Sequence, residues 1–187
     1  MLRRACDDAT SWPDDIKVAV NLSPVQFKQA DLFDVIQSAL RNSGLPPQRL
    51  EIELTESVLL EKAGENHAFM QKLKSIGISL ALDDFGTGYS SLSCLTAFPF
   101  DKIKVDKSFI AKLTKGHKSS AIISSVVTLA SGLDMSVTAE GVETREQFER
   151  LRTLGVNFAQ GYLLGRPVPI DEPAGQSESH RAREDAA

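Results

Sequence analysis

The chain has 187 residues, of which 42% are hydrophobic and 25% are charged, and its formal net charge is −4 at pH 7. This composition is typical of one soluble globular domain that buries a core of its own. It excludes the broad basic surface that binds a nucleic acid polymer, and no apolar run is long enough for a membrane helix. The two cysteines, Cys6 and Cys94, lack a metal-binding spacing, so we expect reduced thiols and a cytoplasmic protein.

Short runs of β-forming residues alternate with helical patterns along the chain. Strands are expected at 17–20, 50–54, 78–82, 102–105, 136–139 and 156–159. The first helix begins at a capping box, Ser23 to Gln26, and is expected to continue to Gly44. Later helices are expected at 67–76, 121–133 and 144–154, with Gly77 ending the first of them. This alternation predicts an α/β fold with a parallel sheet.

Each expected strand ends at or near a polar residue. In parallel α/β folds the carboxyl ends of the strands meet at one edge of the sheet, where reactive groups collect. The most informative end is Asp83-Asp84, because adjacent carboxylates stay ionised most easily beside a cation or hydrogen-bond donors. Gly86 and Gly88 would allow a sharp turn or a close approach to a ligand. Such a pair is more often a turn or a helix cap, so the recurrence of polar strand ends is what favours a site.

Several segments, taken in order, resemble the motifs of the EAL domain, a family of bacterial cyclic di-GMP phosphodiesterases. The segments are 20–23 with Gln26, 53–57, 83–92, 104–109, 139–144, and 160–162 followed by 165–167. Any one of them would be a weak signal, but their shared order over about residues 1 to 170 is specific. The resemblance implies a TIM-like (β/α) barrel that hydrolyses cyclic di-GMP to linear pGpG with two Mg²⁺ or Mn²⁺ ions.

The resemblance also assigns roles to the strand-end residues. It implies that Asn21, Glu53 and Asp83 hold one metal ion, and that Asp83 bridges to a second ion near Asp84. These side chains supply the hard oxygen ligands that Mg²⁺ prefers. Lys104 would orient the attacking water or neutralise developing charge.

Further residues take supporting roles by the same resemblance. Glu140 would be either a ligand of the second ion or the general base, since both roles need an ionised carboxylate. Gln160 would position water or substrate, and Asp106 would contact substrate. Glu56 and Glu143, with Gly86 and Gly88, would hold the Asp83-Asp84 loop. For the two glutamates, a carboxylate favoured at the start of a helix is the alternative.

The resemblance is incomplete at the N-terminus. A full barrel has eight βα units in typically about 250 residues, and we expect about six of them here. The opening strands of the family, with the Glu-Ala-Leu segment that carries a metal-binding glutamate and a nearby arginine, have no counterpart in residues 1–16. The acidic residues there are interpreted as a solvated helix end: Asp7, Asp8, Asp14 and Asp15. We therefore expect an incomplete barrel at 1–172 with impaired activity and unpaired strand edges, and a disordered tail at 173–187.

Two functions remain open at this point. The first is a cyclic di-GMP phosphodiesterase, and the second is an inactive EAL-like module that binds cyclic di-GMP or a protein partner. The presence of Asp84, Lys104 and Glu140 favours the enzyme. A barrel aldolase with Lys104 as its Schiff base is disfavoured, because clustered carboxylates would keep that lysine protonated. As partners, the resemblance implies a homodimer or an upstream sensory or cyclase domain.

Overall fold

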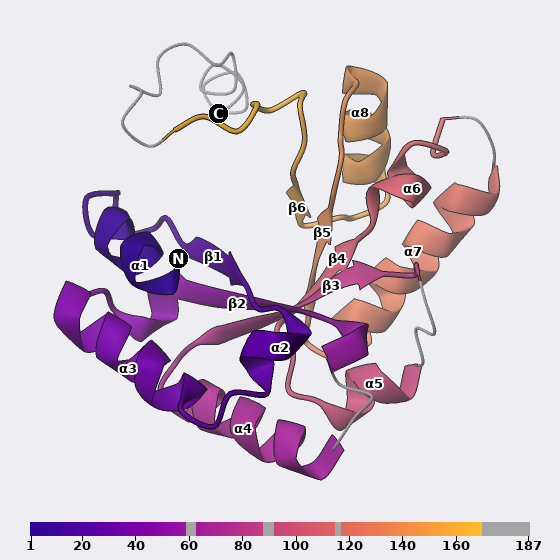
Figure 1. The fold of residues 1–187 in the computed structure, drawn as a ribbon. Coiled ribbons are helices and arrows are strands. Elements are labelled where there is room, and N and C mark those ends of the chain that lie inside the picture. Colours follow the sequence, from indigo (N-terminus) through magenta and orange to yellow (C-terminus); the bar gives the residue numbers. More distant parts are fainter. Residues whose placement is uncertain (59–62, 88–91, 115–116, 170–187) are drawn as a thin grey trace. The chain divides into compact units, whose positions relative to one another are not determined.

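The computed structural model describes residues 1–58, 63–87, 92–114 and 117–169. Its strands are hydrogen-bonded in sequence order, β1-β2-β3-β4-β5-β6. The chain divides into two compact units, residues 1–103 and 104–187 (Figure 1), and each is described by itself. The predicted tail at 173–187 and the predicted role of Gly88 lie outside the described residues.

The first unit contains three parallel strands and the helices that precede and follow them. The strands are β1 (Val18–Asn21), β2 (Leu50–Thr55) and β3 (Ser79–Phe85). The helices are α1 (Leu2–Ala9), α2 (Pro24–Phe27), α3 (Leu32–Ser43), α4 (Ala63–Ser75) and α5 (Leu92–Ala97), with 3-10 helices at Pro47–Arg49 and Glu56–Val58. Helix α1 packs on α3 and β1, and α4 packs on β3 (Figure 1). This strand–helix order is the predicted α/β arrangement.

The helix predicted from Ser23 to Gly44 is two helices in the structure. Its capping box is confirmed, because Gln26 N donates to Ser23 Oγ and Ser23 N donates to Gln26 Oε1. Helix α2 ends at Phe27, and α3 begins at Leu32. Both residues are buried, yet five residues of one continuous helix would turn them about 140° apart. The break after Phe27 therefore lets both side chains reach the core. The predicted stop at Gly44 is confirmed, with φ +75.

The strands of the first unit have one apolar and one polar face. The apolar face is formed by side chains that are at most 1% exposed: Leu50, Ile52, Leu54, Leu80 and Leu82. Because side chains alternate along a strand, Glu51 and Glu53 point to the opposite face, where they are 5% and 6% exposed. Lys102 Nζ lies 2.7 Å from Glu51 Oε2 and balances that charge. The polar face therefore carries buried charge beneath the strand ends.

A buried arginine fixes the segment that precedes β1. Arg49 is 6% exposed. Its guanidinium donates to the carbonyl oxygens of Ala9 (2.8 Å), Ile16 (2.9 Å) and Trp12 (3.3 Å). These bonds satisfy both the cation and three backbone acceptors away from water. Asp14, which lies between these carbonyls in the sequence, is fully exposed, in agreement with the predicted solvated acidic segment.

Among the described helices, none is long and apolar enough to cross a membrane.

The second unit begins within β4 (Lys102–Val105) and contains β5 (Ser136–Ala139), which pairs in parallel with β6 (Phe158–Ala159). Its helices are α6 (Lys107–Ile110), α7 (His117–Gly132) and α8 (Arg145–Thr153). Helix α7 packs on β5. A second capping box, Thr144 with Gln147, starts α8, and Gln147 Nε2 also donates to Ile110 O at 3.2 Å. This buried glutamine joins the start of α8 to the end of α6.

Candidate active site

The ends of β1, β2 and β3 place three oxygen-bearing side chains on one face of the sheet. Asn21 is the register partner of Glu53, and Glu53 is the register partner of Ala81. Asp83 lies two residues beyond Ala81 on β3. Because register partners and every second residue share a face, the side chains of Asn21, Glu53 and Asp83 project to the same side. Three of the predicted metal ligands are thus brought onto one face within the first unit.

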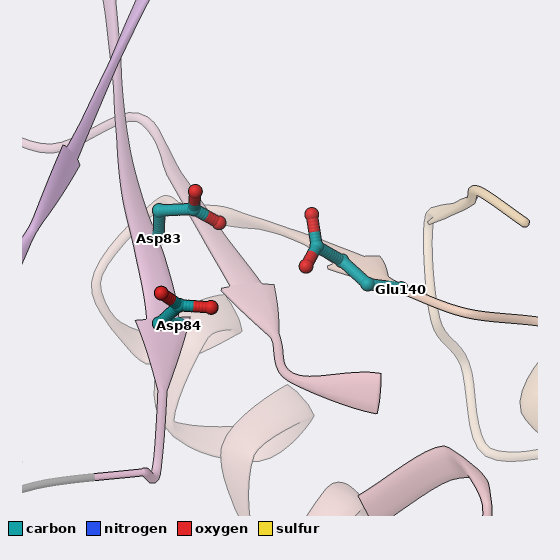
Figure 2. A group of neighbouring side chains, drawn as sticks. All are labelled: Asp83, Asp84 and Glu140. Atoms are coloured by element: carbon teal, nitrogen blue, oxygen red, sulfur yellow. The ribbon is translucent and has the colours of Figure 1, made fainter. Parts of the chain in front are cut away.

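The fourth predicted ligand, Asp84, has a left-handed backbone conformation. Its φ is +54, a value that is uncommon outside glycine but tolerated by aspartate. The carbonyl of Asp84 accepts hydrogen bonds from Thr87 N (3.2 Å) and Thr87 Oγ1 (3.0 Å), and Gly86 turns the chain with φ +96. Figure 2 shows the carboxylates of Asp83 and Asp84 on the same side of the strand, and their closest ligand oxygens lie within 4.8 Å of each other. Two adjacent anions in this geometry suit a divalent cation.

In the second unit, Lys104 and Glu140 form an ion pair. Lys104 Nζ lies 2.7 Å from Glu140 Oε1, and the side chains are 5% and 20% exposed. Lys104 lies on β4, and Glu140 directly follows β5. The backbone N of Glu140 donates to Val105 O at 3.1 Å, which fixes the end of β5 beside the end of β4. The arrangement holds a carboxylate in one orientation beside a buried cation.

A cavity of about 250 Å³ opens between the loops that follow β5 and β6. Its lining residues are Lys107, Glu140, Gly141, Glu143, Gln160, Gly161 and Tyr162. The two loops are hydrogen-bonded through Val142 N to Gln160 O (3.0 Å) and Leu163 N to Val142 O (3.0 Å). Gln160 and Glu140, two of the predicted catalytic residues, therefore line one cavity in the second unit.

Asp106 follows β4 and caps the short helix α6. Its carboxylate accepts a hydrogen bond from Ser108 N at 2.9 Å. Burial acts to raise the pKa of this carboxyl group. The hydrogen bonds from the side chain and backbone of Ser108 and from Lys107 N, together with the charge of Lys107, outweigh burial and lower the pKa below its ordinary value. Asp106 is therefore a fixed anion at this strand end, and its contact with substrate stays a prediction.

The structure gives Glu56 and Glu143 positions at helix starts. Glu56 opens a 3-10 helix, and Glu143 directly precedes Thr144, the N-cap of α8. The backbone N of Glu143 donates to Gln147 Oε1 at 2.8 Å, while its side chain is exposed. These positions agree with the helix-start alternative, and a role in holding the Asp83-Asp84 loop stays a prediction for both.

Lys107 and Tyr162 also line the cavity. Neither was predicted as a site residue, although both lie within the segments that resemble the family's motifs. The guanidinium carbon of Arg166 lies 4.5 Å from the centroid of the Tyr162 ring, a contact that was not predicted. The available signal was an aromatic residue followed four positions later by a cation. That signal is weak, because a pair of this kind is common on protein surfaces.

Curated proteins that resemble this chain are much longer than it is. The chain is 46% identical over 172 residues to the uncharacterized protein y4lL of Sinorhizobium fredii, covering 92% of the chain and 21% of that protein. It is 40% identical over 176 residues to the bifunctional diguanylate cyclase/cyclic di-GMP phosphodiesterase MucR of Pseudomonas aeruginosa, covering 92% of the chain and 26% of that protein. The chain thus spans about a fifth to a quarter of the length of these relatives.

Solved structures match the fold across most of the chain. The MucR phosphodiesterase in complex with c-di-GMP has a TM-score of 0.84 at 41% identity, covering 90% of this chain and 70% of that one. The EAL domain of Mycobacterium smegmatis DcpA has a TM-score of 0.86 at 34% identity, covering 91% and 79%. A manganese and c-di-GMP complex of Klebsiella pneumoniae BlrP1 has a TM-score of 0.81 at 35% identity, covering 88% and 43%.

These neighbours and the parallel strand order confirm the predicted fold class, an α/β fold with about six βα units of a TIM-like barrel. The family model of the EAL domain matches residues 1–167. The motifs predicted from the sequence lie within this match. The chain therefore belongs to the EAL domain family.

Proposed function

We propose that this chain hydrolyses one phosphodiester bond of cyclic di-GMP in a metal-dependent reaction that gives linear pGpG. The observation that carries the proposal is the register of β1, β2 and β3, which sets Asn21, Glu53 and Asp83 on one face with Asp84 beside them. Support comes from relatives at 39–40% identity that are named cyclic di-GMP phosphodiesterases. Membership of the family alone would fit an inactive binding module equally well.

The donor set fits a hard divalent cation. One amide oxygen and three carboxylates match the preference of Mg²⁺ and Mn²⁺ for oxygen ligands. Asn21, Glu53, Asp83 and Asp84 would hold the cations, and Glu140 would join them if it acts as a ligand. When bound, the cations supply Lewis-acid polarisation of the phosphoryl group.

The remaining steps fall to side chains of the second unit. Glu140, in its role as general base, accepts a proton from the water that attacks phosphorus. Lys104, at 2.7 Å, holds the Glu140 carboxylate in place and offsets charge that develops in the transition state. Gln160, at the end of β6, orients the water or the substrate through its amide. Asp106 and Lys107, next to each other after β4, lie at the strand end where the ribose or phosphate groups would pass.

Regulation by other domains or by a second copy is part of this proposal. Because the chain covers 26% of MucR, whose name joins cyclase and phosphodiesterase activities, we expect this domain to work beside a sensory or cyclase domain or as a homodimer. Its activity as an isolated chain would then be lower than in its assembled form.

The experiment is a chromatographic assay of cyclic di-GMP with the purified chain in Mn²⁺ and in EDTA. We expect pGpG to form in Mn²⁺ alone, and we expect Asp83→Asn to abolish it, because a neutral amide is a poor ligand for two cations. Asp15→Asn, at an exposed acidic residue of the N-terminal segment, is the matched control and should keep full activity. Binding of cyclic di-GMP without turnover would instead support the binding module.

A further inference from the structure

The second unit contains a buried hydroxyl group that the proposed chemistry does not use, on Thr138. This residue lies on β5 and is 6% exposed. Its side-chain oxygen Oγ1 is buried, and no residue that the structure describes donates a hydrogen bond to it or accepts one from it. Such a group destabilises the folded state, because the hydroxyl gives up its bonds to water and gains none in return. What lies around it therefore indicates what it could bind.

The register of the strands places this hydroxyl beside the ion pair of Lys104 and Glu140. The backbone N of Glu140 donates to Val105 O at 3.1 Å, a bond that in a parallel ladder aligns Glu140 with the residue after Val105. Thr138, two residues earlier on β5, is then aligned with Lys104. Because register partners and every second residue share a face of the sheet, the side chains of Thr138, Lys104 and Glu140 project to the same side.

Lys104 is suited to bind the Thr138 hydroxyl. On the other side of β5, Thr138 pairs with Phe158, whose apolar side chain offers no hydrogen bond. The Lys104 ammonium has three donors on a flexible four-carbon stem, and Glu140 Oε1, at 2.7 Å, accepts one of them. Because neighbouring strands lie about 4.8 Å apart, a rotation of the stem brings the ammonium within reach of Thr138 Oγ1 without a movement of the backbone.

We infer that Thr138 is a positioning residue, a second acceptor that binds the Lys104 ammonium when the Glu140 carboxylate turns to another partner. The inference rests on the proposed function for the event that turns it, since each role proposed for Glu140 directs its carboxylate toward a cation or a water. Lys104 is then a buried cation whose bond to Glu140 is weakened, which is unfavourable. A hydrogen bond from Lys104 to the Thr138 hydroxyl offsets that loss and keeps the positive charge in the site.

The test is a set of thermal melts without metal or substrate. In the wild type, Thr138→Val replaces the hydroxyl by a methyl group and should leave Tm unchanged or higher, since it removes a polar group without a partner. Glu140→Met takes away the first acceptor, so that Lys104 should bond to Thr138. Adding Thr138→Val to Glu140→Met should lower Tm by at least about 3 °C, the effect of one hydrogen bond to a charged group in a chain of this size. Equal shifts of Tm in the two backgrounds overturn the inference.

Two controls separate the second acceptor from a purely structural role of Thr138. In Lys104→Met/Glu140→Met the ammonium is gone, so Thr138→Val should again leave Tm unchanged or higher. Thr138→Ser keeps the hydroxyl, so it should lower the Tm of Glu140→Met less than Thr138→Val does. If Glu140→Met does not fold, Glu140→Gln takes its place, and the shifts should keep their signs. A serine variant as harmful as the valine variant, or a loss of Tm that persists without Lys104, overturns the inference.

Hydrolysis of cyclic di-GMP in Mn²⁺, measured on the wild type and Thr138→Val, separates this inference from the proposed function. Thr138→Val should lower kcat by about tenfold or more with little change in KM, because a hydrogen bond to a charged group is missing only after Glu140 has turned away. Equal kcat in the two proteins overturns the role of Thr138 in the reaction. A loss of Tm that depends on Lys104, in a chain that does not hydrolyse cyclic di-GMP, supports the second acceptor and overturns the proposed hydrolysis.

Discussion

Lys104 Nζ lies 2.7 Å from Glu140 Oε1, so the ends of β4 and β5 are joined by an ion pair whose lysine is 5% exposed. Removing one partner of a buried pair leaves a charge in a medium that solvates it poorly. The pair therefore ties the proposed chemistry to the stability of the second unit.

Neutralising Glu140 should cost both stability and activity. We expect Glu140→Gln to lower the free energy of unfolding by up to about 3 kcal/mol, the low end of the range for a broken buried pair, because the side chain keeps some contact with water. Urea unfolding measures this. The double variant Lys104→Met/Glu140→Gln should recover part of the loss. If the double variant loses as much unfolding free energy as Lys104→Met and Glu140→Gln lose together, the two residues are not coupled and the prediction is contradicted.

Glu53 should contribute to metal affinity because it shares a sheet face with Asn21 and Asp83. We expect Glu53→Gln to weaken Mn²⁺ binding by about tenfold or more, since one charged ligand becomes neutral. Isothermal titration with Mn²⁺ measures the effect, and Asp15→Asn serves as the control with an exposed carboxylate. Equal Mn²⁺ affinity in the wild type and Glu53→Gln would show that Glu53 is not a ligand of the metal.

Arg49 should stabilise the N-terminal segment of the first unit. Arg49→Met removes the donor shared by the carbonyls of Ala9, Trp12 and Ile16. We expect the free energy of unfolding to fall by about 1–3 kcal/mol, which is the cost of one unsatisfied buried acceptor. Asp14→Ala, which removes only an exposed ion-pair partner 3.5 Å away, should change it by less than about 0.5 kcal/mol. Similar losses in both variants would show that the ion pair, and not the carbonyl bonds, is what matters.

Asp106 should make stability depend on pH in the acid range. Its pKa is lower in the folded state than its ordinary value, in spite of burial, because of the bonds from Ser108 and Lys107 and the charge of Lys107. The stabilisation is therefore fully present above the unfolded pKa and is lost as the pH falls through the folded pKa. Asp106→Asn keeps a cap but cannot ionise. The stability difference between the wild type and this variant, measured by urea unfolding, should shrink from neutral pH into that acid range. A constant difference would contradict the prediction.

The strands that could be predicted from the sequence are those with the clearest alternation. The predicted strands at 102–105 and 136–139 are confirmed to the residue. The strand predicted at 156–159 pairs only through Phe158 and Ala159, because propensity does not tell how many residues find a partner. The helix predicted across Phe27 and Leu32 was wrong in its continuity, since burial of both side chains needs a break between them.

The candidate residues could be named from the sequence, but their contacts could not. Polar residues at strand ends pointed to Asp83 and Glu140, because parallel strands bring these ends to one edge of a sheet, and the resemblance to the family pointed to Glu53. The pairing of Glu51 with Lys102 depends on strand register, which the alternation alone leaves open. The Tyr162–Arg166 contact depends on a loop conformation set by Gly161, which no periodic pattern encodes.

The most direct test of the account is a thermal melt of the chain with Mn²⁺, with cyclic di-GMP, with both and with neither, repeated on Asp83→Asn. The account predicts the largest rise in Tm for the wild type with both ligands, since ligands that bind only the folded state at 100 times Kd add about 2.7 kcal/mol. It predicts no metal-dependent rise for Asp83→Asn. A wild-type melt that ignores both ligands, or an equal rise in the variant, would contradict the central claim that these strand-end carboxylates form a metal-dependent site for cyclic di-GMP.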